Sequence, residues 1–187
     1  CDRGYLRHQR EWRDQVAEEC SAKVWQVESD VIVPVEQASD KAEYAARTIR
    51  PKLQEQMAKY LTRLDTTSLK KDSLRLPKDG IDLSNLDDAL DQMSLDRSVG
   101  PVDNFQGGTS QAKSHLRSFL DDKLSDYDDR SNVVEPNVSR LSPYLHFGQI
   151  SPVAVALEVS SSRGHRQADK EAFIEELLVR RELANNF

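Results

Sequence analysis

The stretch that decides the fold is NVSRLSPYLHFGQISP, residues 137–152, which contains two Ser-Pro pairs. In the pairs at Ser142 and Ser151 the serine oxygen can cap a helix, and proline suits the first helical position, which needs no N–H. The pairs therefore predict two helices that begin nine residues apart. A helix start offers free N–H donors and the positive end of the helix dipole. The loop with Ser139 and Ser142 is thus either a set of ordinary caps, the commoner use, or a cradle for a phosphate.

Composition limits the classes of protein. Of the 187 residues, 37% are hydrophobic and 31% are charged, which allows a modest core under a heavily solvated surface. The net charge of −6 disfavours a dedicated nucleic-acid module, because phosphate binding normally needs a basic face. Cys1 and Cys20 form neither a disulfide framework nor a metal motif, and they favour a reducing compartment. Because the cysteines lack metal-ligand spacing, no metal is expected. No apolar run approaches membrane-spanning length, so no membrane is expected as a partner.

The first third of the chain predicts the end of an α/β domain followed by helices. Residues 5–19 have helical spacing of apolar positions, whereas residues 24–27 and 31–33 are rich in the β-branched residues that favour strands. Between residues 36 and 65 we expect two helices divided at Pro51, because proline disfavours helical geometry in the residue before it. The second of these helices carries an apolar packing stripe made of Leu53, Met57, Tyr60, Leu61 and Leu64.

The remaining chain predicts a polar connection and then more helices. From residue 66 to residue 108 periodicity fades between prolines and glycines, which indicates a surface connection with a short helix at 84–93. Thr109 is predicted to cap the next helix, which continues to Leu124. A last helix is expected over residues 169–187. Its charged residues have the spacing of solvent-facing salt bridges worth about 0.2–0.5 kcal/mol each: Glu176, Arg180, Arg181 and Glu182.

Three blocks of the sequence resemble the class II cyclobutane pyrimidine dimer photolyases, within the photolyase and cryptochrome family. The second block is shared across that superfamily, whereas the first and third indicate class II. The first block comprises DRGYLR (2–7), WR (12–13), VIVPVE (31–36), DK (40–41) and YAARTIRP (44–51), the second is LSPYLHFGQISP (141–152), and the third is EELLVRRELANNF (175–187).

The resemblance implies a mainly α fold in two domains. Residues 1–35 would end an amino-terminal α/β, Rossmann-like domain, residues 36–108 would form an interdomain connection with helices, and residues 109–187 would begin an all-helical FAD-binding catalytic domain. The chain starts with cysteine rather than methionine and stops within a helical pattern. We therefore expect it to be an internal fragment of a longer protein, which by itself is inactive.

The function implied for the parent protein is light-driven DNA repair by a monomeric carbon–carbon lyase, located wherever the cell holds its DNA. In the family, light excites fully reduced FAD, which passes an electron to a pyrimidine dimer flipped out of UV-damaged DNA; the cyclobutane ring splits and the electron returns. An antenna chromophore would bind to a region that precedes Cys1.

Site residues are carried over from the family residue by residue. Gln149 would line the FAD cavity, whose other expected contacts are Tyr127, Ser139, Arg140, Leu141 and Ser142. Glu176 matches the catalytic acidic residue that contacts the base edge of the dimer, where a protonated carboxyl group stabilises the radical anion. Arg180 falls where related enzymes carry a tryptophan that stacks on the lesion, so it is the second expected substrate contact. Arg181 would pair within the helical domain.

Two other functions remain open from the sequence. A cryptochrome-like blue-light signalling flavoprotein would keep the flavin loop but would not repair DNA. A helical interaction domain without a cofactor is compatible with the composition. Glu176, placed within the class II third block, favours repair.

Overall fold

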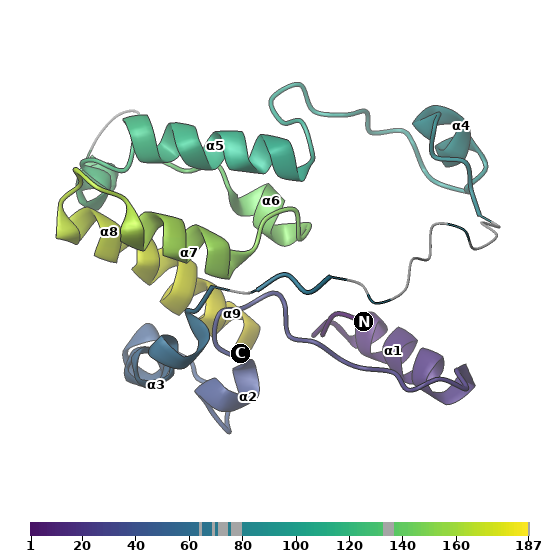
Figure 1. Cartoon of the computed structure of the whole chain (residues 1–187), viewed down its shortest axis with the longest axis horizontal. Helices are drawn as coiled ribbons and strands as arrows, with labels where there is room; N and C mark the ends of the chain where they lie inside the picture. Colours follow the sequence, from purple (N-terminus) through teal and green to yellow (C-terminus); the bar gives the residue numbers. More distant parts are fainter. Residues whose placement is uncertain (64, 69, 71–74, 76–79, 133–136, 187) are drawn as a thin grey trace. The chain divides into compact units, whose positions relative to one another are not determined.

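The computed structural model describes residues 1–63, 65–68, 70, 75, 80–132 and 137–186, and Figure 1 shows its helices. The chain divides into two compact units, of which the first joins Cys1–Arg63 to Gly107–Phe187 and the second is Leu64–Gln106. Among the described residues the regular structure is helical, with one isolated parallel bridge between Asp2 and Val27. The expectation of a mainly α fold is confirmed.

The first unit contains most of the helices. Its amino-terminal part holds α1 (Arg7–Glu19), α2 (Val35–Ala38) and α3 (Ala46–Tyr60). Its carboxyl-terminal part holds α5 (Thr109–Asp122), the 3-10 helix η1 (Tyr127–Asn132), α6 (Ser142–His146), α7 (Pro152–Ser161), α8 (Gln167–Ile174), the π-helix η2 (Glu175–Arg180) and α9 (Arg181–Asn186). In the second unit, α4 (Leu86–Asp91) is the short helix expected near residues 84–93.

The core of the first unit lies where α5, α7 and α8 pack together (Figure 1). Phe119 of α5 lies 4.9 Å from Phe173 of α8, measured between ring centroids. Val155 and Val159 of α7 are fully buried, as is Leu124 beyond the end of α5. Fully burying side chains of this size stabilises a fold by about 1.5–3 kcal/mol each, and this apolar cluster holds the helices together.

Two predicted strands are absent, and the expectation of strands at residues 24–27 and 31–33 is wrong for this structure. A strand needs a neighbour to receive its backbone N–H groups. The N–H groups of Ile32 and Val33 instead donate to one carboxylate oxygen of Glu182 in α9, at 2.6 Å and 3.1 Å. Glu182 is 2% exposed and thereby ties an extended segment to the last helix. Side-chain acceptance thus replaces the sheet ladder.

The helix break expected at Pro51 is also wrong, because α3 continues through that residue. Proline lacks an N–H, so the turn loses one hydrogen bond, and its ring crowds the carbonyl four residues earlier. Ile49 and Leu53 are fully buried on either side of Pro51. Their burial on one continuous face compensates for the lost bond. Leu64, at the end of the expected stripe, lies outside the described residues.

The two Ser-Pro pairs differ in how their helices begin. Ser151 is the N-cap of α7 and accepts a hydrogen bond from the N–H of Ala154 at 3.4 Å, as expected. Ser142 is instead the first residue of α6, whose cap position is Leu141, and no side chain caps that helix. The expected cap at Thr109 is wrong in the same way, because Gly108, with φ of 115°, takes the position before α5.

The difference between the two serines leads to a stability prediction. Ser151→Ala removes the hydrogen bond that caps α7 and should lower the free energy of unfolding by about 0.5–2 kcal/mol. Ser142→Ala, in the matched Ser-Pro position of α6, should change it by less than about 0.5 kcal/mol because no cap is lost. Urea unfolding followed by circular dichroism measures both. Equal losses would show that Ser142 also caps its helix.

Glu182 should make the stability depend on pH. Burial raises the pKa of its carboxyl group to about 8, against an ordinary value of 4.5, despite the two N–H donors. Between these pH values the folded chain keeps a proton that the unfolded chain has lost. The free energy of unfolding should therefore fall as pH rises, by at most about 1.4 kcal/mol per pH unit.

Glu182→Gln provides the control for this pH dependence. The amide keeps an oxygen that can accept from Ile32 and Val33 but does not titrate, so the slope between about pH 5 and about pH 8 should disappear. Urea unfolding of both proteins across this range measures the slope. The same slope in both proteins would contradict the assignment to Glu182.

Candidate functional site

The loop before α6 carries four of the expected FAD-binding residues. Ser139 accepts a hydrogen bond from the N–H of Leu141 at 3.3 Å, which forms a local turn. Arg140 adopts φ of 54°, a backbone conformation uncommon for residues other than glycine, and its side chain is exposed. Arg140 makes no ion pair with any described residue. The exposed side chains of Arg140 and Ser142 are therefore the groups in this loop that can meet an anion.

Leu141 anchors this loop to the core. Its side chain is 1% exposed, and Tyr144 and Leu145 in the following helix are also buried. The burial of these three residues explains why α6 forms although it is only five residues long. The polar side chains of the loop are held at the surface by an apolar anchor beneath them.

Gln149 links this region to the start of α5. Its Oε1 accepts a hydrogen bond from the N–H of Gly108 at 2.9 Å. Its backbone N–H donates to the carbonyl of Tyr144 at 2.8 Å. Because the side-chain oxygen Oε1 of Gln149 is bound by Gly108, the side-chain amide nitrogen is the part that remains to contact a ligand.

Tyr127 begins η1 and lies against the apolar core. Its ring packs edge-on to Phe119 at 5.5 Å and to Phe173 at 5.4 Å between centroids. Only 7% of Tyr127 is exposed, and this burial raises the pKa of its phenol. The guanidinium of Arg130 lies over the same ring, 4.4 Å from its centroid. Tyr127 is thus a platform between the core and a charged residue.

Arg130 joins Tyr127 to Glu176. Its Nη2 donates to Oε1 of Glu176 at 2.7 Å, while its Nη1 donates to the carbonyl of Tyr127 at 3.3 Å. The Glu176 side chain is 43% exposed, whereas that of Arg130 is 24% exposed. The expected catalytic carboxylate therefore lies at the surface of the fold, in a charge-assisted hydrogen bond.

Most charged residues of the last helical segment that have a partner pair with distant parts of the chain. Glu175 binds Arg50 of α3 through two hydrogen bonds, at 2.6 Å and 3.0 Å, which lower the pKa of its carboxyl group. Arg180 lies 3.9 Å from Glu175, and Arg181 donates to the carbonyl of Asp30. The expected pairs between neighbouring turns of this helix are wrong for Glu176, Arg181 and Glu182, whose partners lie far away in sequence. Arg180 alone of the four has its ion-pair partner, Glu175, within the same segment.

The expected site residues form two groups in this structure. One is the loop from Ser139 to Ser142; the other is Tyr127 with Glu176, brought together by Arg130. No hydrogen bond, ion pair or ring contact between described residues joins the loop to Glu176. Sequence reasoning missed Arg130 as a site residue. Its position three residues after Tyr127 was the available signal, since residues i and i+3 lie one above the other in a 3-10 helix.

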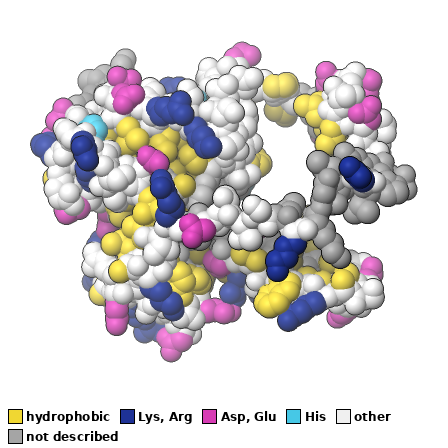
Figure 2. Space-filling view, in the orientation of Figure 1, with side chains coloured by type: hydrophobic (Ala, Val, Ile, Leu, Met, Phe, Trp, Pro, Cys, Tyr) yellow, Lys and Arg dark blue, Asp and Glu magenta, His cyan; other side chains and the backbone are white. Residues whose placement is uncertain are grey.

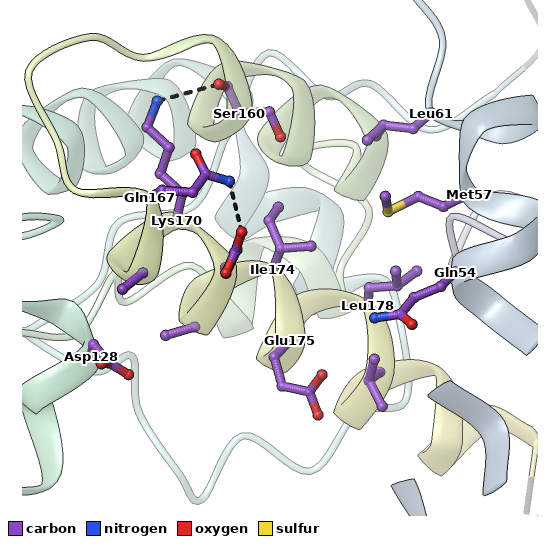
Figure 3. Close-up of a pocket in the computed structure, with 14 residues that line it drawn as sticks. Gln54, Met57, Leu61, Asp128, Ser160, Gln167, Lys170, Ile174, Glu175 and Leu178 are labelled. Carbon is purple, nitrogen blue, oxygen red and sulfur yellow. Dashed lines mark hydrogen bonds between the residues drawn. The ribbon is translucent and has the colours of Figure 1, made fainter. Parts of the chain in front are cut away.

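A cleft of about 730 Å³ opens between α3 and the α8–η2 segment (Figure 3). Met57, Leu61, Ile174 and Leu178 provide its apolar walls. Polar side chains at its edge bind one another or the backbone: Gln167 with Glu171 at 2.9 Å, and Lys170 with the carbonyl of Ser160 at 3.3 Å (Figure 3). None of the expected FAD or substrate residues lines this cleft.

The surface near the cleft is mixed in character. Figure 2 shows hydrophobic side chains of the first unit interspersed with lysine, arginine and acidic side chains. No group of three or more His, Cys, Asp or Glu side chains suited to a metal ion occurs in the described part of the chain. Within the same described residues, no helix has both the length and the apolar character needed to span a bilayer.

Comparisons with known proteins find photolyases, through a family model in the first part of the chain and through relatives along its whole length. The family model described as DNA photolyase matches residues 1–70. The chain is 42% identical over 187 residues to the deoxyribodipyrimidine photo-lyase of Methanothermobacter thermautotrophicus, matching 100% of this chain and 40% of that protein. The protein of the same name from Potorous tridactylus is 35% identical over 185 residues, which are 97% of this chain and 34% of that protein.

One solved structure is similar to this chain in fold. A bacterial class III photolyase from Agrobacterium tumefaciens matches 99% of this chain with a TM-score of 0.62 and 20% identity, over 39% of its own chain. The present chain spans 40% or less of the length of the curated relatives described here. The chain is thus similar to a DNA photolyase family model in its first part and to proteins named deoxyribodipyrimidine photo-lyase along its entire length.

Proposed function

We propose that this chain is part of a class II photolyase, a light-driven enzyme that splits cyclobutane pyrimidine dimers in UV-damaged DNA. The observation that carries the proposal is the half-exposed carboxylate of Glu176, held by Arg130 within the block that resembles class II. The 42% identity with a deoxyribodipyrimidine photo-lyase supports the reaction. The class II assignment rests on the first and third sequence blocks.

FAD would be held by the loop before α6, and the chemistry of that loop fits a diphosphate. The guanidinium of Arg140 and the hydroxyl of Ser142 are both exposed, and Arg140 has no competing carboxylate among the described residues. Ser139 shapes the turn, the buried Leu141 fixes it, and the amide nitrogen of Gln149 would point a further donor at the cofactor. Tyr127 completes the proposed set through the arginine that lies on its ring.

The damaged base pair would be read by Glu176 and Arg180. A carboxyl group can hydrogen-bond the edge of a flipped thymine, and a guanidinium plane can stack on a base. Arg180 suits the stacking role because its side chain is 57% exposed. Its ion pair with Glu175 is long, at 3.9 Å, and holds the guanidinium weakly. A damaged pair stacks poorly, so extruding it from the duplex costs less than extruding a normal pair.

Bound reduced FAD would supply the electron that light drives into the dimer. Two carbon–carbon bonds of the cyclobutane ring then break and the electron returns, so the reaction has no net oxidation or reduction. The residues of this chain would orient the lesion, keep water away and hold hydrogen-bond donors and acceptors at the base edge. We assign residues 109–187 to the start of the FAD-binding domain, residues 36–108 to the connection and residues 1–35 to the end of the preceding domain.

The direct test uses the full-length protein purified with FAD. Under blue light it should convert a dimer-containing oligonucleotide to intact thymines, measured by chromatography, and it should not do so in the dark. Glu176→Gln should lower the splitting yield about tenfold, the equivalent of roughly 1.4 kcal/mol. Flavin binding without splitting would favour light signalling, and an absence of flavin absorbance would favour an interaction domain.

The FAD site is tested separately by replacing exposed polar residues of the loop. Arg140→Ala and Ser142→Ala should each reduce flavin retention in the full-length protein, measured by the ratio of visible to ultraviolet absorbance. Ser110→Ala is a matched control, because Ser110 is also an exposed serine in the first turn of a helix. Because Ser142 forms no cap, flavin loss should occur without a loss of stability. Unchanged flavin content in both variants would contradict the loop assignment.

A further inference from the structure

We infer that Arg130 is a positioning residue for Glu176, which it holds by one carboxylate oxygen so that the other oxygen is presented to the substrate. The inference deepens the proposed function and rests on it.

Arg130 is itself held rigidly. Its guanidinium lies on the ring of Tyr127 and also donates to the Tyr127 carbonyl. Because the Tyr127 ring packs against both Phe119 and Phe173, this support is part of the apolar core. A guanidinium stacked on a fixed ring loses most of its rotational freedom, so its free N–H groups point in a defined direction.

The turn that carries Arg130 is fixed at its start as well. The N–H of Asp128 donates to the carboxylate of Asp169 at 3.0 Å. Asp169 is fully buried and binds Arg166 through two hydrogen bonds of 2.9 Å, which lower the pKa of the Asp169 carboxyl group. The neighbouring carboxylate of Asp129 lies 3.7 Å from Arg166 and makes no ion pair with Arg130. Arg130 is therefore left to pair with Glu176.

The carboxylate of Glu176 is held on one side only. Its Oε1 accepts from Arg130, whereas its Oε2 accepts no hydrogen bond from any described residue. The adjacent Glu175 is held by Arg50 of α3, so two consecutive carboxylates bind arginines from different elements. This divergence occurs within the π-helix η2, whose wider turn is a feature often found at functional sites.

The arrangement has a chemical consequence for the proposed reaction. An anchored oxygen prevents rotation of the carboxyl group, so its second oxygen keeps one orientation toward a base edge. Preorganised groups of this kind need no rearrangement when charge develops on the substrate. The carboxyl group of Glu176 would separate the positive charge of Arg130 from the base on which negative charge would develop.

Two variants of the full-length, FAD-loaded protein test the inference. Arg130→Gln removes the guanidinium, whereas Arg50→Gln removes an equally direct arginine–carboxylate pair from the adjacent Glu175. Dark binding of a dimer-containing oligonucleotide and the splitting yield at saturating DNA are measured separately. Arg130→Gln should lower the splitting yield roughly tenfold, as expected for a misplaced group, with less than about a threefold change in dark binding. Arg50→Gln should change the yield by less than about twofold.

Arg130→Lys distinguishes positioning from general stabilisation. Lysine keeps the charge but lacks the planar, stacked fork, so it should restore part of the yield that Arg130→Gln loses. If Arg130→Gln lowers the flavin content or the melting temperature more than Arg50→Gln does, the splitting yield of Arg130→Lys is compared with that of Arg50→Gln instead. Equal yields in the Arg130 and Arg50 variants, with wild-type splitting intact, overturn this inference alone. A flavin-loaded wild-type protein that splits no dimer overturns the proposed function and the inference together.

Discussion

The architecture of the first unit depends on a buried carboxyl group that takes the place of a neighbouring β-strand. Glu182 receives the N–H groups of Ile32 and Val33 and so fixes an extended segment against α9, about 150 residues away in sequence. Burying a polar group is costly, and the two donors offset part of that cost. Arg181, one residue earlier, donates to the carbonyl of Asp30. Consecutive side chains of one helix therefore bind both carbonyl and N–H groups of the extended segment.

Local patterns were sufficient to locate helices but not to identify their tertiary partners. The Ser-Pro pair at Ser151 produced the expected cap, because capping involves atoms three residues apart. Residues 31–33 have the composition of a strand, but a strand also depends on which acceptor lies alongside it. That acceptor comes from the far end of the chain. Pro51 shows the same limit, since burial on both sides of it decided whether α3 would continue.

The candidate site was predictable in its parts and not in its assembly. Glu176 and Tyr127 were identified through family resemblance, but the residue between them was not, because Arg130 and Glu176 are 46 positions apart. The sequence pattern predicted that the charged residues of the last helix pair with one another, as such residues usually do on exposed helices. The structure distributes them among α3, η1 and the segment at Asp30. Charged side chains that the sequence pattern places on an exposed helix surface thus form tertiary contacts.

The π-helix η2 sets the phase between the two halves of the last helical segment. Before it, Glu175 and Glu176 reach arginines of α3 and η1; after it, Glu182 reaches the backbone at Val33. An α-helix turns by about 100° per residue, so removing one residue from the π turn would rotate one half against the other by about that angle. Either the carboxylate of Glu176 or the buried carboxyl group of Glu182 would then lose its partners. The length of this irregular turn is therefore what lets both sets of contacts form in one helical segment.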